Sequence, residues 1–457
     1  MDSKASVFFA SLRGKRVAVC GLGSNNTPVV RQLLELGALV EARDRCSREQ
    51  LGDTADDLER AGAVLCLGDG YLDGLENADL ILRTPGMKPY LPAFEAARRR
   101  SITVTSEMEL FFELCPAPIY AVTGSDGKTT TTTVIAGLLD AGGRRVFLGG
   151  NIGRPLLPLV EQMKADDAAV VELSSFQLTR MTCSPHVSVV TNVAPNHLDW
   201  HTDMAEYIDA KRNIVAHQTS ADRAVLNADN AVTAGFVQDT RAQVFPFSRK
   251  GSLPCGAWVQ YGVIYAAAPG ETPVAVMPTA DIRLPGQHNV ENYLAAFAAV
   301  WGEVAPPLLA AFARSFGGVP HRCELARELH GVRWYNDSIG TSPSRTIAGL
   351  EAFDKPVILI AGGYDKHLDY APLGAAAKGR VKHAVLLGAT ADKIAAALPR
   401  SVPVTRVADM AGAVASAAAL AQEGDIVFMS PASASFDMYK NFEERGEDFK
   451  RLVGELE

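Results

Sequence analysis

Residues 123–130 read TGSDGKTT, between an apolar run at 118–122 and a threonine-rich helical segment. A phosphate loop needs this order of buried strand, glycine-rich turn and helix start. Glycines let backbone N–H groups turn inward around phosphate oxygens, and the helix N-terminus adds about half a positive charge. Lys128 would reach the β- and γ-phosphates, and Thr129 or Thr130 would offer a hydroxyl to Mg²⁺. The stretch therefore predicts a site for nucleotide phosphates.

The spacing of this loop is shorter than the usual GxxxxGK[ST] pattern. Val122 stands five residues before Gly127, where that pattern has a glycine, so the loop reads GxxGKTT. The alternative is an ordinary strand-to-helix turn that carries a surface lysine. The correct order of strand and helix around the loop favours phosphate binding.

The composition is typical of a globular protein with several domains. The chain has 457 residues, of which 47% are hydrophobic and 21% charged, and its net charge is −8. At about 150 residues per domain, this length suggests about three domains. A nucleic-acid-binding protein would need a basic face, and the net charge argues against one.

The sequence predicts neither membrane insertion nor secretion. No apolar run reaches the roughly 18 residues that span a bilayer. The N-terminal run Ser6–Leu12 is short and lacks the small-residue cleavage site of a signal peptide. The seven cysteines have no metal-finger or CxxC spacing, which is typical of ordinary thiols in a reducing compartment. We expect a cytoplasmic protein.

Strand and helix patterns alternate along the whole chain, which is typical of α/β layering. The first strand is followed by a glycine turn at 21–23 and by a helix that we expect Thr27 to cap and Gly37 to end. The expected strands are 16–20, 38–42 and 78–82 in the first unit, 118–122, 168–171 and 187–192 in the second, and 356–361, 384–387 and 425–429 in the third. We predict three domains: a Rossmann-like domain at 1–106, a P-loop ATPase-type domain at 107–318 and a second Rossmann-like domain at 319–457.

The N-terminal glycine turn Gly21-Leu22-Gly23, with Asp44 after the second expected strand, resembles a dinucleotide-binding fingerprint. In that fingerprint the acid binds a ribose hydroxyl. Asn26 occupies the third glycine position, where we expect it to keep the helix from approaching the strand closely. Two interpretations stay open: a nucleotide site, as in an NAD-dependent oxidoreductase, and a tight turn of any α/β domain.

Polar residues also follow two strands of the second unit. Glu172 ends the strand 168–171 beside the phosphate loop, where its carboxylate could bind Mg²⁺ or simply be solvated. His197 follows the next strand, in NVAPNHLD at 192–199, and a functional role and a structural role are equally open. The helical pattern around Lys211 by itself indicates a solvated lysine.

Asn289 and Asn292 lie three residues apart in GQHNVEN at 286–292, so they share one face of the expected helix. Paired amides suit the edge of a purine, which offers both donors and acceptors. Helix capping by Asn289 is the alternative, and the pattern alone favours capping.

Together and in this order, these segments resemble the Mur ligase family, which makes amide bonds in peptidoglycan precursors with ATP. The resemblance covers essentially the whole chain. Its most specific segment, SPASASFDMYKNFEERG at 430–446, is similar to the glutamate-adding branch of the family. The other shared segments are TGSDGKTTT at 123–131, GGNIG at 149–153, ELSSFQL at 172–178, NVAPNHLD at 192–199, GQHNVEN at 286–292, PHRCE at 320–324, YNDSIGTS at 335–342 and AGGYDK at 361–366.

The resemblance implies a cytoplasmic ATP-dependent ligase of three domains, acting as a monomer. Its substrates would be the small molecules UDP-N-acetylmuramoyl-L-alanine and D-glutamate, joined through an acyl phosphate. Its cofactors would be ATP and Mg²⁺, the latter at two sites. In this interpretation the N-terminal glycine turn binds the UDP part of the substrate and not NAD.

The resemblance also implies a role for each matching position. Lys211 would be carbamylated, which turns a cation into an anionic metal ligand. The catalytic positions would be Lys128, His197, Lys211 and Arg322, and the metal-binding positions Thr129, Glu172, His197 and Lys211. ATP would be bound by Gly124, Ser125, Asp126, Gly127, Lys128, Thr129, Thr130, Asn289, Asn292, Arg322 and Asp337. The UDP-sugar would be bound by Gly23, Ser24, Asp44, Arg45, Thr84, Gly86, Asn151 and Ser174, and glutamate by Thr341, Lys366, Ser435, Phe436 and Phe442.

Three positions depart from the family pattern. Ile339 stands where many members have Lys, Asn196 where Asp is usual before the metal-binding His, and Arg45 where Thr is frequent. Three other classes stay as alternatives: an NAD-dependent oxidoreductase, a nucleotide-binding regulator without catalysis, and a related ligase such as a folylpolyglutamate synthetase. The UDP-type N-terminal unit argues against the last of these.

Overall fold

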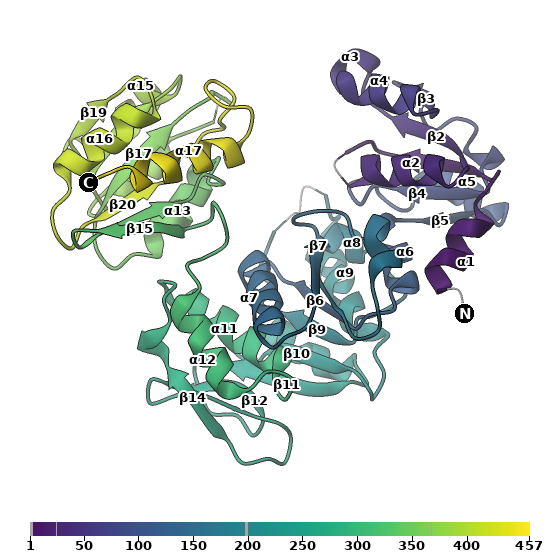
Figure 1. The fold of residues 1–457 in the computed structure, drawn as a ribbon, viewed down its shortest axis with the longest axis horizontal. Helices are drawn as coiled ribbons and strands as arrows, with labels where there is room; N and C mark the ends of the chain where they lie inside the picture. The colour runs from purple at the N-terminus through teal and green to yellow at the C-terminus, as the bar shows by residue number, and fades with distance from the viewer. Residues whose placement is uncertain (1–2, 24, 197–199, 367) are drawn as a thin grey trace. The chain divides into compact units, whose positions relative to one another are not determined.

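The computed structural model describes residues 3–23, 25–196, 200–366 and 368–457, and these residues form three β-sheets with helices packed against them (Figure 1). The chain divides into two compact units, residues 1–280 with 290–312 and residues 281–289 with 313–457. The predicted α/β fold class is confirmed. The domain boundaries at 106 and 318 stay predictions.

The first sheet is parallel throughout, with the strand order β3-β2-β1-β4-β5. This is the Rossmann-like order that the N-terminal pattern predicted. The strand order reverses between β1 and β4, and ligands of open α/β sheets bind at such a point, beyond the carboxyl ends of the strands. The strands are β1 (Arg16–Cys20), β2 (Leu39–Asp44), β3 (Val64–Leu67), β4 (Leu80–Arg83) and β5 (Thr103–Thr105).

The helix after the glycine turn, α2 (Asn26–Glu35), begins earlier than predicted. Asn25, not Thr27, occupies its N-cap position. Thr27 instead lies in the first turn of the helix, where its hydroxyl donates to the carbonyl of Leu22 (3.1 Å). The threonine therefore stabilises the glycine turn and not the helix end. The helix ends before Gly37, which has a φ of +83°, as predicted.

The second sheet has the order β14-β13-β12-β11-β10-β9-β6-β8-β7, with antiparallel pairing only from β12 to β14. The phosphate loop follows β6, which lies between β9 and β8. The carboxyl ends of these three strands therefore meet beside the loop. The strands are β6 (Ile119–Thr123), β7 (Val146–Gly150), β8 (Ala168–Glu172), β9 (Val187–Val190), β10 (Arg223–Asn227), β11 (Gln243–Ser248), β12 (Gly256–Gln260), β13 (Val263–Ala267) and β14 (Val274–Pro278).

The third sheet has the order β15-β16-β20-β17-β18-β19 and is parallel except for β15 at its edge. The predicted third α/β unit is thus present. The loops after β16, β20 and β17 leave from neighbouring strands. The strands are β15 (Glu324–Leu329), β16 (Val332–Asn336), β17 (Val357–Gly362), β18 (Val381–Leu387), β19 (Val404–Arg406) and β20 (Ile426–Met429).

Helices cover both faces of each parallel region (Figure 1). In the first unit they are α1 (Lys4–Ser11), α2, α3 (Arg48–Leu51), α4 (Asp53–Arg60), α5 (Pro92–Arg99), α6 (Glu107–Leu114), α7 (Lys128–Ala141), α8 (Ser175–Leu178), α9 (Met204–Ala216) and α10 (Ala231–Gly235). Further along the chain are α11 (Gln287–Val300), α12 (Pro306–Ser315), α13 (Pro343–Glu351), α14 (Ala371–Ala377), α15 (Ala391–Ala397), α16 (Met410–Leu420) and α17 (Phe442–Gly454). Short 3₁₀ turns lie at 75–77, 157–162, 236–238 and 279–281.

The central strand β17 shows why the third sheet needs helices on both faces. Leu359 packs in one apolar cluster with residues of α13, α14 and α15, and its neighbour Ile360 packs in another with residues of α16 and α17. Successive strand residues point to opposite faces, so a strand that is apolar at every position must be covered twice. The continuous apolar run that predicted this strand is the sequence sign of that double burial.

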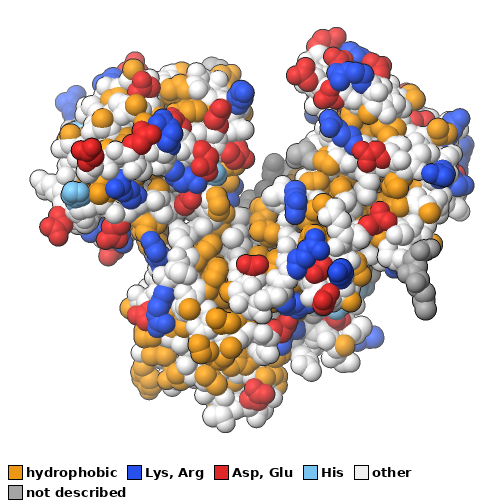
Figure 2. Space-filling model, in the orientation of Figure 1, with side chains coloured by type: hydrophobic (Ala, Val, Ile, Leu, Met, Phe, Trp, Pro, Cys, Tyr) orange, Lys and Arg blue, Asp and Glu red, His pale blue; other side chains and the backbone are white. Residues whose placement is uncertain are grey.

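The surface carries charges of both signs. Figure 2 shows acidic and basic side chains intermixed on the visible face. Within the described part of the chain, no helix is both long enough and apolar enough to cross a membrane.

Helix packing in the third sheet predicts a large effect of one added methyl group. Gly374 lies in α14, where a Cβ would stand 1.9 Å from the carbonyl oxygen of Ala397. We expect Gly374→Ala to lower the free energy of unfolding by about 1–3 kcal/mol, because backbone must move to admit the methyl group. Urea denaturation followed by circular dichroism measures this. Gly235→Ala is the control, since a Cβ there meets nothing within 4 Å; equal stability of the two variants would contradict the close packing of α14.

Candidate active site

The phosphate loop turns so tightly that two of its positions admit only glycine. Gly124 has a φ of +153°, and a Cβ there would lie 1.8 Å from Oγ1 of Thr191. Gly127 has a φ of +77°, and its Cβ would lie 2.3 Å from Oδ1 of Asn292. The backbone thus approaches neighbouring side chains from two sides, which is what a loop that surrounds a phosphate requires.

The residues after β9 hold this loop in shape. The Thr191 hydroxyl donates to the carbonyl of Asp126 (2.6 Å), and the N–H of Asp126 donates to Oδ1 of Asn192 (3.0 Å). Ser125 donates its hydroxyl to the carbonyl of Ala194 (2.8 Å). The strand was predicted to run to Asn192, but β9 ends at Val190. The side chains of Thr191 and Asn192 bind the loop instead.

The loop lysine is folded over the loop itself. Nζ of Lys128, the first residue of α7, donates to the carbonyls of Gly124 and Ser125 (3.0 Å each). The predicted phosphate lysine is therefore at the mouth of the loop, at the positive end of a 14-residue helix. Thr130, which was also predicted to bind ATP, is half-buried in the first turn of that helix.

A buried carboxylate lies beside the loop at the end of β8. Glu172 is 2% exposed, and its two oxygens accept from the Thr129 hydroxyl (2.7 Å) and the Asn151 amide (2.8 Å). In the part of the chain that the structure describes, it forms no ion pair. An ionised carboxylate and a threonine hydroxyl are hard oxygen donors of the kind that Mg²⁺ prefers. These residues fit a bound Mg²⁺, whose charge would balance that of Glu172.

Lys211 of α9 is buried beside the same loop. It is 1% exposed, and Nζ donates to the carbonyl of Gly124 (2.8 Å) and to the Thr123 hydroxyl (3.3 Å). Burial lowers the pKa of its amine well below the usual range, and the nearby charge of Lys128 adds to this effect. The solvated lysine that the helical pattern indicated is therefore wrong, because the packing of α9 against the loop encloses the side chain.

Two predicted residues, Ser24 and His197, lie outside the described residues. The metal set can be assessed only for its other members, Thr129, Glu172 and Lys211. Among the described residues, no group of three or more His, Cys, Asp or Glu side chains could hold a metal ion. The described donors for a metal are therefore one carboxylate and one hydroxyl.

The N-terminal glycine turn meets the loop after β4. Gly21 has a φ of +92°, and a Cβ there would lie 2.4 Å from Cγ2 of Thr84. Asn26 is buried, and its side-chain amide donates to the carbonyl of Gly21 (2.9 Å). The asparagine at the third glycine position thus binds the turn, a contact that the sequence pattern did not indicate.

Asp44 also binds this turn. Its oxygens accept from the N–H groups of Leu22 (2.7 Å) and Cys46 (2.8 Å). The predicted UDP-sugar residues Gly23, Arg45 and Gly86 are exposed around it. Ser174, also predicted for this substrate, caps α8 through its hydroxyl, which accepts from the N–H of Gln177 (3.2 Å). In this structure the Asp44 carboxylate therefore binds the glycine turn, and the Ser174 hydroxyl caps α8.

The paired asparagines lie on the first turns of α11 and are both buried. Oδ1 of Asn292 accepts from the Thr131 hydroxyl (3.2 Å), so this residue lies against the phosphate-loop helix. The side chain of Asn289 donates to the carbonyl of Pro285 (2.6 Å), four residues before it. This bond ties the helix start to the preceding turn.

In the second unit, Asp337 follows β16 and is buried. Its carboxylate accepts from the Ser430 hydroxyl (2.7 Å) and from the N–H of Cys323 (3.2 Å). Burial raises the pKa of Asp337 to about 6, and the hydrogen bonds and the nearby charge of Arg322 lower it in part. Arg322, the predicted phosphate residue, thus lies within electrostatic reach of Asp337.

The predicted glutamate positions lie in loops at the carboxyl edge of the third sheet. Thr341 follows β16, Lys366 follows β17, and Ser435 and Phe436 follow β20; these strands are neighbours in the sheet. Ser435 is buried, whereas Lys366 and Phe436 are exposed. Phe442 begins α17, and its carbonyl accepts from the Ser338 hydroxyl (2.7 Å). Phe436 also lines an open hollow of about 680 Å³ with residues 437–440, 444 and 448.

Sequence reasoning missed Arg445, which joins two of these loops. It is 1% exposed, and its guanidinium donates to the carbonyls of Ser338 (2.8 Å), Ser433 (3.2 Å) and Ala434 (3.1 Å). Burial lowers its pKa to about 10. The signal was present, because Phe442, Arg445 and Phe449 repeat at helical spacing and place the arginine on the apolar face of α17.

Known protein families match two parts of this chain. Residues 122–300 match the Mur ligase middle domain, and residues 321–433 match the Mur ligase glutamate ligase domain. A UDP-N-acetylmuramoylalanine–D-glutamate ligase of Acetivibrio thermocellus is 48% identical over 466 aligned residues, which cover both chains completely. The protein of the same name from a Clostridium botulinum strain is 46% identical, with 97% of each chain covered.

The chain belongs to the Mur ligase family. Two solved structures of Mur ligases have the same fold at 17% identity. A UDP-N-acetylmuramate–alanine ligase of Thermotoga maritima has a TM-score of 0.57, with 96% of this chain and 98% of that chain covered. A UDP-N-acetylmuramoyl-L-alanyl-D-glutamate–2,6-diaminopimelate ligase has a TM-score of 0.56, with 92% of each chain covered. The three-domain fold and the family resemblance expected from the sequence are therefore confirmed for this Mur ligase.

The buried carboxyl of Asp337 predicts how the stability of this Mur ligase depends on pH. Its pKa is raised from 3.8 to about 6, so the unfolded chain releases this proton first as the pH rises. Stability is therefore lost between about pH 4 and 6 and stays reduced above that, by about 2–3 kcal/mol for a shift of this size. Asp337→Asn removes the ionisation, and the Ser430 hydroxyl can reverse its role to accept from the new amide.

We expect Asp337→Asn to be more stable than the native protein at pH 8 and to lose this advantage as the pH falls through 6 towards 4. Urea denaturation at pH 4, 6 and 8 checks the trend. Asp392→Asn is the control, because the side chain of Asp392 is 88% exposed. A stability difference for Asp337→Asn that does not change with pH would show that the carboxyl titrates normally.

Proposed function

We propose that this protein joins D-glutamate to UDP-N-acetylmuramoyl-L-alanine with ATP, in the cytoplasmic synthesis of peptidoglycan precursors. The observation that carries the proposal is the glycine loop at 124–127, which opens α7 and lies beside the buried Glu172. Full-length relatives named for this reaction, at 46–48% identity, supply the substrates. Small molecules are therefore the partners, and we propose that the enzyme acts as a monomer.

The reaction needs ATP because an ionised carboxylate is a poor electrophile. In the first step an oxygen of the alanine carboxylate attacks the γ-phosphorus, the bond to ADP breaks, and an acyl phosphate forms. In the second step the amine of glutamate attacks the acyl carbon, phosphate leaves with the bonding electron pair, and the nitrogen releases a proton. Enzymes assist such transfers mainly by positioning the reactants and neutralising charge.

The phosphate loop supplies positioning and charge for the first step. The N–H groups at the start of α7 and the ammonium of Lys128 would surround the phosphates. Arg322 is proposed to bind the γ-phosphate, and Asp337 the ribose. Asn289 and Asn292 are proposed for adenine, which their buried amides on one face of α11 suit. A bound Mg²⁺ would neutralise phosphate charge during the transfer, held by Thr129 and Glu172.

The two remaining substrates are assigned to the loops of the other sheets. The turn of Gly21, the loop after β4 and the residues Asn151 and Ser174 are proposed for the UDP-sugar. The support is the strand-order reversal between β1 and β4, where open α/β sheets bind ligands. Loops after β16, β17 and β20 are proposed for glutamate, with Lys366 in reach of solvent to pair with a carboxylate.

We further propose that Lys211 is carbamylated. Burial lowers the pKa of its amine, which favours the neutral form, and it is the neutral form of an amine that attacks carbon dioxide and then loses a proton. The carbamate would carry a negative charge beside the loop. It would supply a second anionic oxygen donor for a metal, beside Glu172. His197 is proposed as a ligand of a second metal site.

Carbamylation predicts a specific carbon signal. Protein equilibrated with ¹³C-labelled bicarbonate should show one slowly exchanging carbamate resonance in its ¹³C NMR spectrum, and Lys211→Gln should lack it while keeping its fold. A native spectrum without this resonance would contradict the carbamate. Its retention in Lys211→Gln would assign it to another amine.

The proposed function is tested by phosphate release. ATP and Mg²⁺ with UDP-N-acetylmuramoyl-L-alanine are incubated with D-glutamate or with L-glutamate, and inorganic phosphate is measured. We expect release that needs the nucleotide substrate and prefers D-glutamate. A preference for L-glutamate would retain the chemistry and change the substrate. No release with either isomer, together with ATP binding, would reject the ligase assignment in favour of a nucleotide-binding regulator.

The phosphate loop makes a quantitative prediction in the same assay. Lys128→Ala should lower kcat/KM by at least about 100-fold, because a charge directed at the transferred phosphate is lost. Circular dichroism should show an unchanged fold. Lys164→Ala, at an exposed position, is the control with expected native activity. Near-native activity of Lys128→Ala would show that the loop does not bind the reacting phosphates.

A further inference from the structure

The turn that carries Arg322 contains a histidine in an unfavourable backbone conformation. The N–H of Arg322 donates to the carbonyl of Val319 (2.9 Å), and Pro320 and His321 are the central residues of this turn. His321 has a φ of +62°, a value that favours Gly or Asn at the third position of a type II turn. A histidine in this backbone conformation must therefore be held there by contacts with its surroundings.

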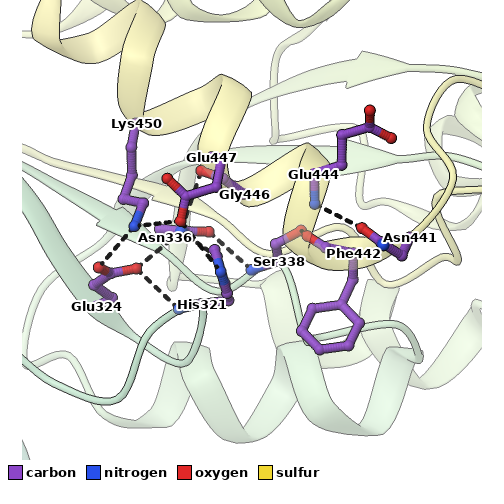
Figure 3. A network of polar contacts seen from close by, with 10 residues as sticks. All are labelled: His321, Glu324, Asn336, Ser338, Asn441, Phe442, Glu444, Gly446, Glu447 and Lys450. Carbon is purple, nitrogen blue, oxygen red and sulfur yellow. Dashed lines mark hydrogen bonds and ion pairs between the residues drawn. The ribbon is translucent and has the colours of Figure 1, made fainter.

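The backbone and the ring of His321 are both held (Figure 3). Its N–H donates to Oε2 of Glu324 (2.8 Å), and its carbonyl accepts from the N–H of Ile339 (3.1 Å). The ring lies against α17, where a Cβ at Gly446 would be 2.1 Å from Nδ1. The ring therefore fills a slot that only a glycine on α17 leaves open, edge-on to the ring of Phe442.

Asn336, the last residue of β16, faces the same ring and is completely buried. Its Oδ1 accepts from the N–H of Ser338 (3.1 Å), and a backbone N–H can only donate. Its Nδ2 donates to Oε2 of Glu324 (3.0 Å), an oxygen that also accepts from the N–H of His321, while Oε1 of Glu324 lies 3.2 Å from Nζ of Lys450. Two independent partners thus fix which end of the amide is nitrogen.

This orientation decides the protonation of His321. The same Nδ2 lies 3.0 Å from Nδ1 of His321 and 3.4 Å from the carbonyl of Gly446; the shorter contact takes the second hydrogen of the amide, so Nδ1 accepts. An accepting Nδ1 carries no hydrogen, which leaves the neutral ring with its hydrogen on Nε2. Nε2 faces Oε1 of Glu447 (3.5 Å), an acceptor on α17 that Lys450 also contacts (2.8 Å). The charged groups around the ring are therefore Glu324, Glu447 and Lys450.

We propose that Asn336 is a positioning residue whose amide holds His321 in the neutral Nε2–H form, and that the ring so held keeps the turn at 319–322, and Arg322 with it, in place for the phosphates of ATP. The second half of this inference rests on the proposed role of Arg322. The first half concerns the protein without substrate. The two halves can be tested separately.

The substitution Asn336→Asp keeps almost the same shape but removes both donations of the amide, the one to Nδ1 of His321 and the one to Oε2 of Glu324. The new carboxylate would face the carboxylate of Glu324, so Asn336→Asp is read together with His321→Gly, which leaves the Asn336–Glu324 bond in place. The aspartate still accepts from Ser338, but it cannot donate to Nδ1 of His321, so a ring with a hydrogen on Nδ1 is favoured. Long-range ¹H–¹⁵N NMR of histidine-labelled protein reports which ring nitrogen carries hydrogen, and the His321 signal is assigned by its absence in His321→Gly. We expect the Nε2–H pattern in the native protein and a protonated Nδ1 in Asn336→Asp. A native ring protonated on Nδ1 would overturn the proposal.

The consequence for Arg322 is measured by ATP binding. Asn336→Asp should weaken ATP binding about tenfold, the effect expected from losing a buried hydrogen bond that positions a charged group. The KM for D-glutamate should stay unchanged, because the aspartate keeps the bond to Ser338 and the loop that follows it. Glu447→Gln is the matched control: the side chain of Glu447 is 63% exposed, and a glutamine oxygen still accepts from Nε2. It should retain the native NMR pattern and the native affinity.

His321→Gly keeps the proposal testable if Asn336→Asp does not fold. Glycine adopts the backbone conformation of the turn without strain, so this variant removes the ring and leaves the turn. We expect the same tenfold loss of ATP affinity. Native affinity in His321→Gly would show that the turn backbone alone places Arg322 and would overturn the proposal. If the native protein binds ATP but releases no phosphate, the proposed function fails, whereas the NMR and affinity results still decide the positioning role.

Discussion

The bonds from the end of β9 to the phosphate loop are the constraint on which the central site depends. Thr191 and Asn192 bind the carbonyl and the N–H of Asp126, while Gly124 passes so close to Thr191 that no side chain fits. The shape of the loop is thereby held by residues of the protein itself. The other residues of the site lie around this loop: Lys128 folds over it, Lys211 donates to it, and Glu172 lies beside it.

Burial acts in opposite directions on the charged groups of the two units. It lowers the pKa of the Lys211 amine and raises the pKa of the Asp337 carboxyl, because in each case it disfavours the charged form. For Lys211 the shift favours the neutral amine, the form that the proposed carbamate requires. For Asp337 the result is a lower free energy of unfolding near neutral pH. Such a loss of stability is typical of residues that bind a ligand, the role proposed for Asp337.

Local patterns predicted the elements of the site better than they predicted its side chains. The apolar run at 16–20 and the order of strand, loop and helix around 123–130 were correct, because they depend on neighbours in the sequence. Lys211 was misjudged by pattern alone, since its burial depends on Gly124, 87 residues away. Asp44 fitted a ribose-binding pattern, yet its oxygens accept from two N–H groups of nearby turns, which no spacing rule indicates.

The sequence by itself determined the family, the order of the α/β elements and the position of the glycine loop, because each is encoded in residues that follow one another. Only the tertiary structure decided which side chains are enclosed and what they donate or accept. The buried arginine at 445, the amide of Asn336 and the ring of His321 acquire their roles from partners on other elements. Desolvation and hydrogen-bond direction are properties of such assembled surroundings, so no single segment contains them.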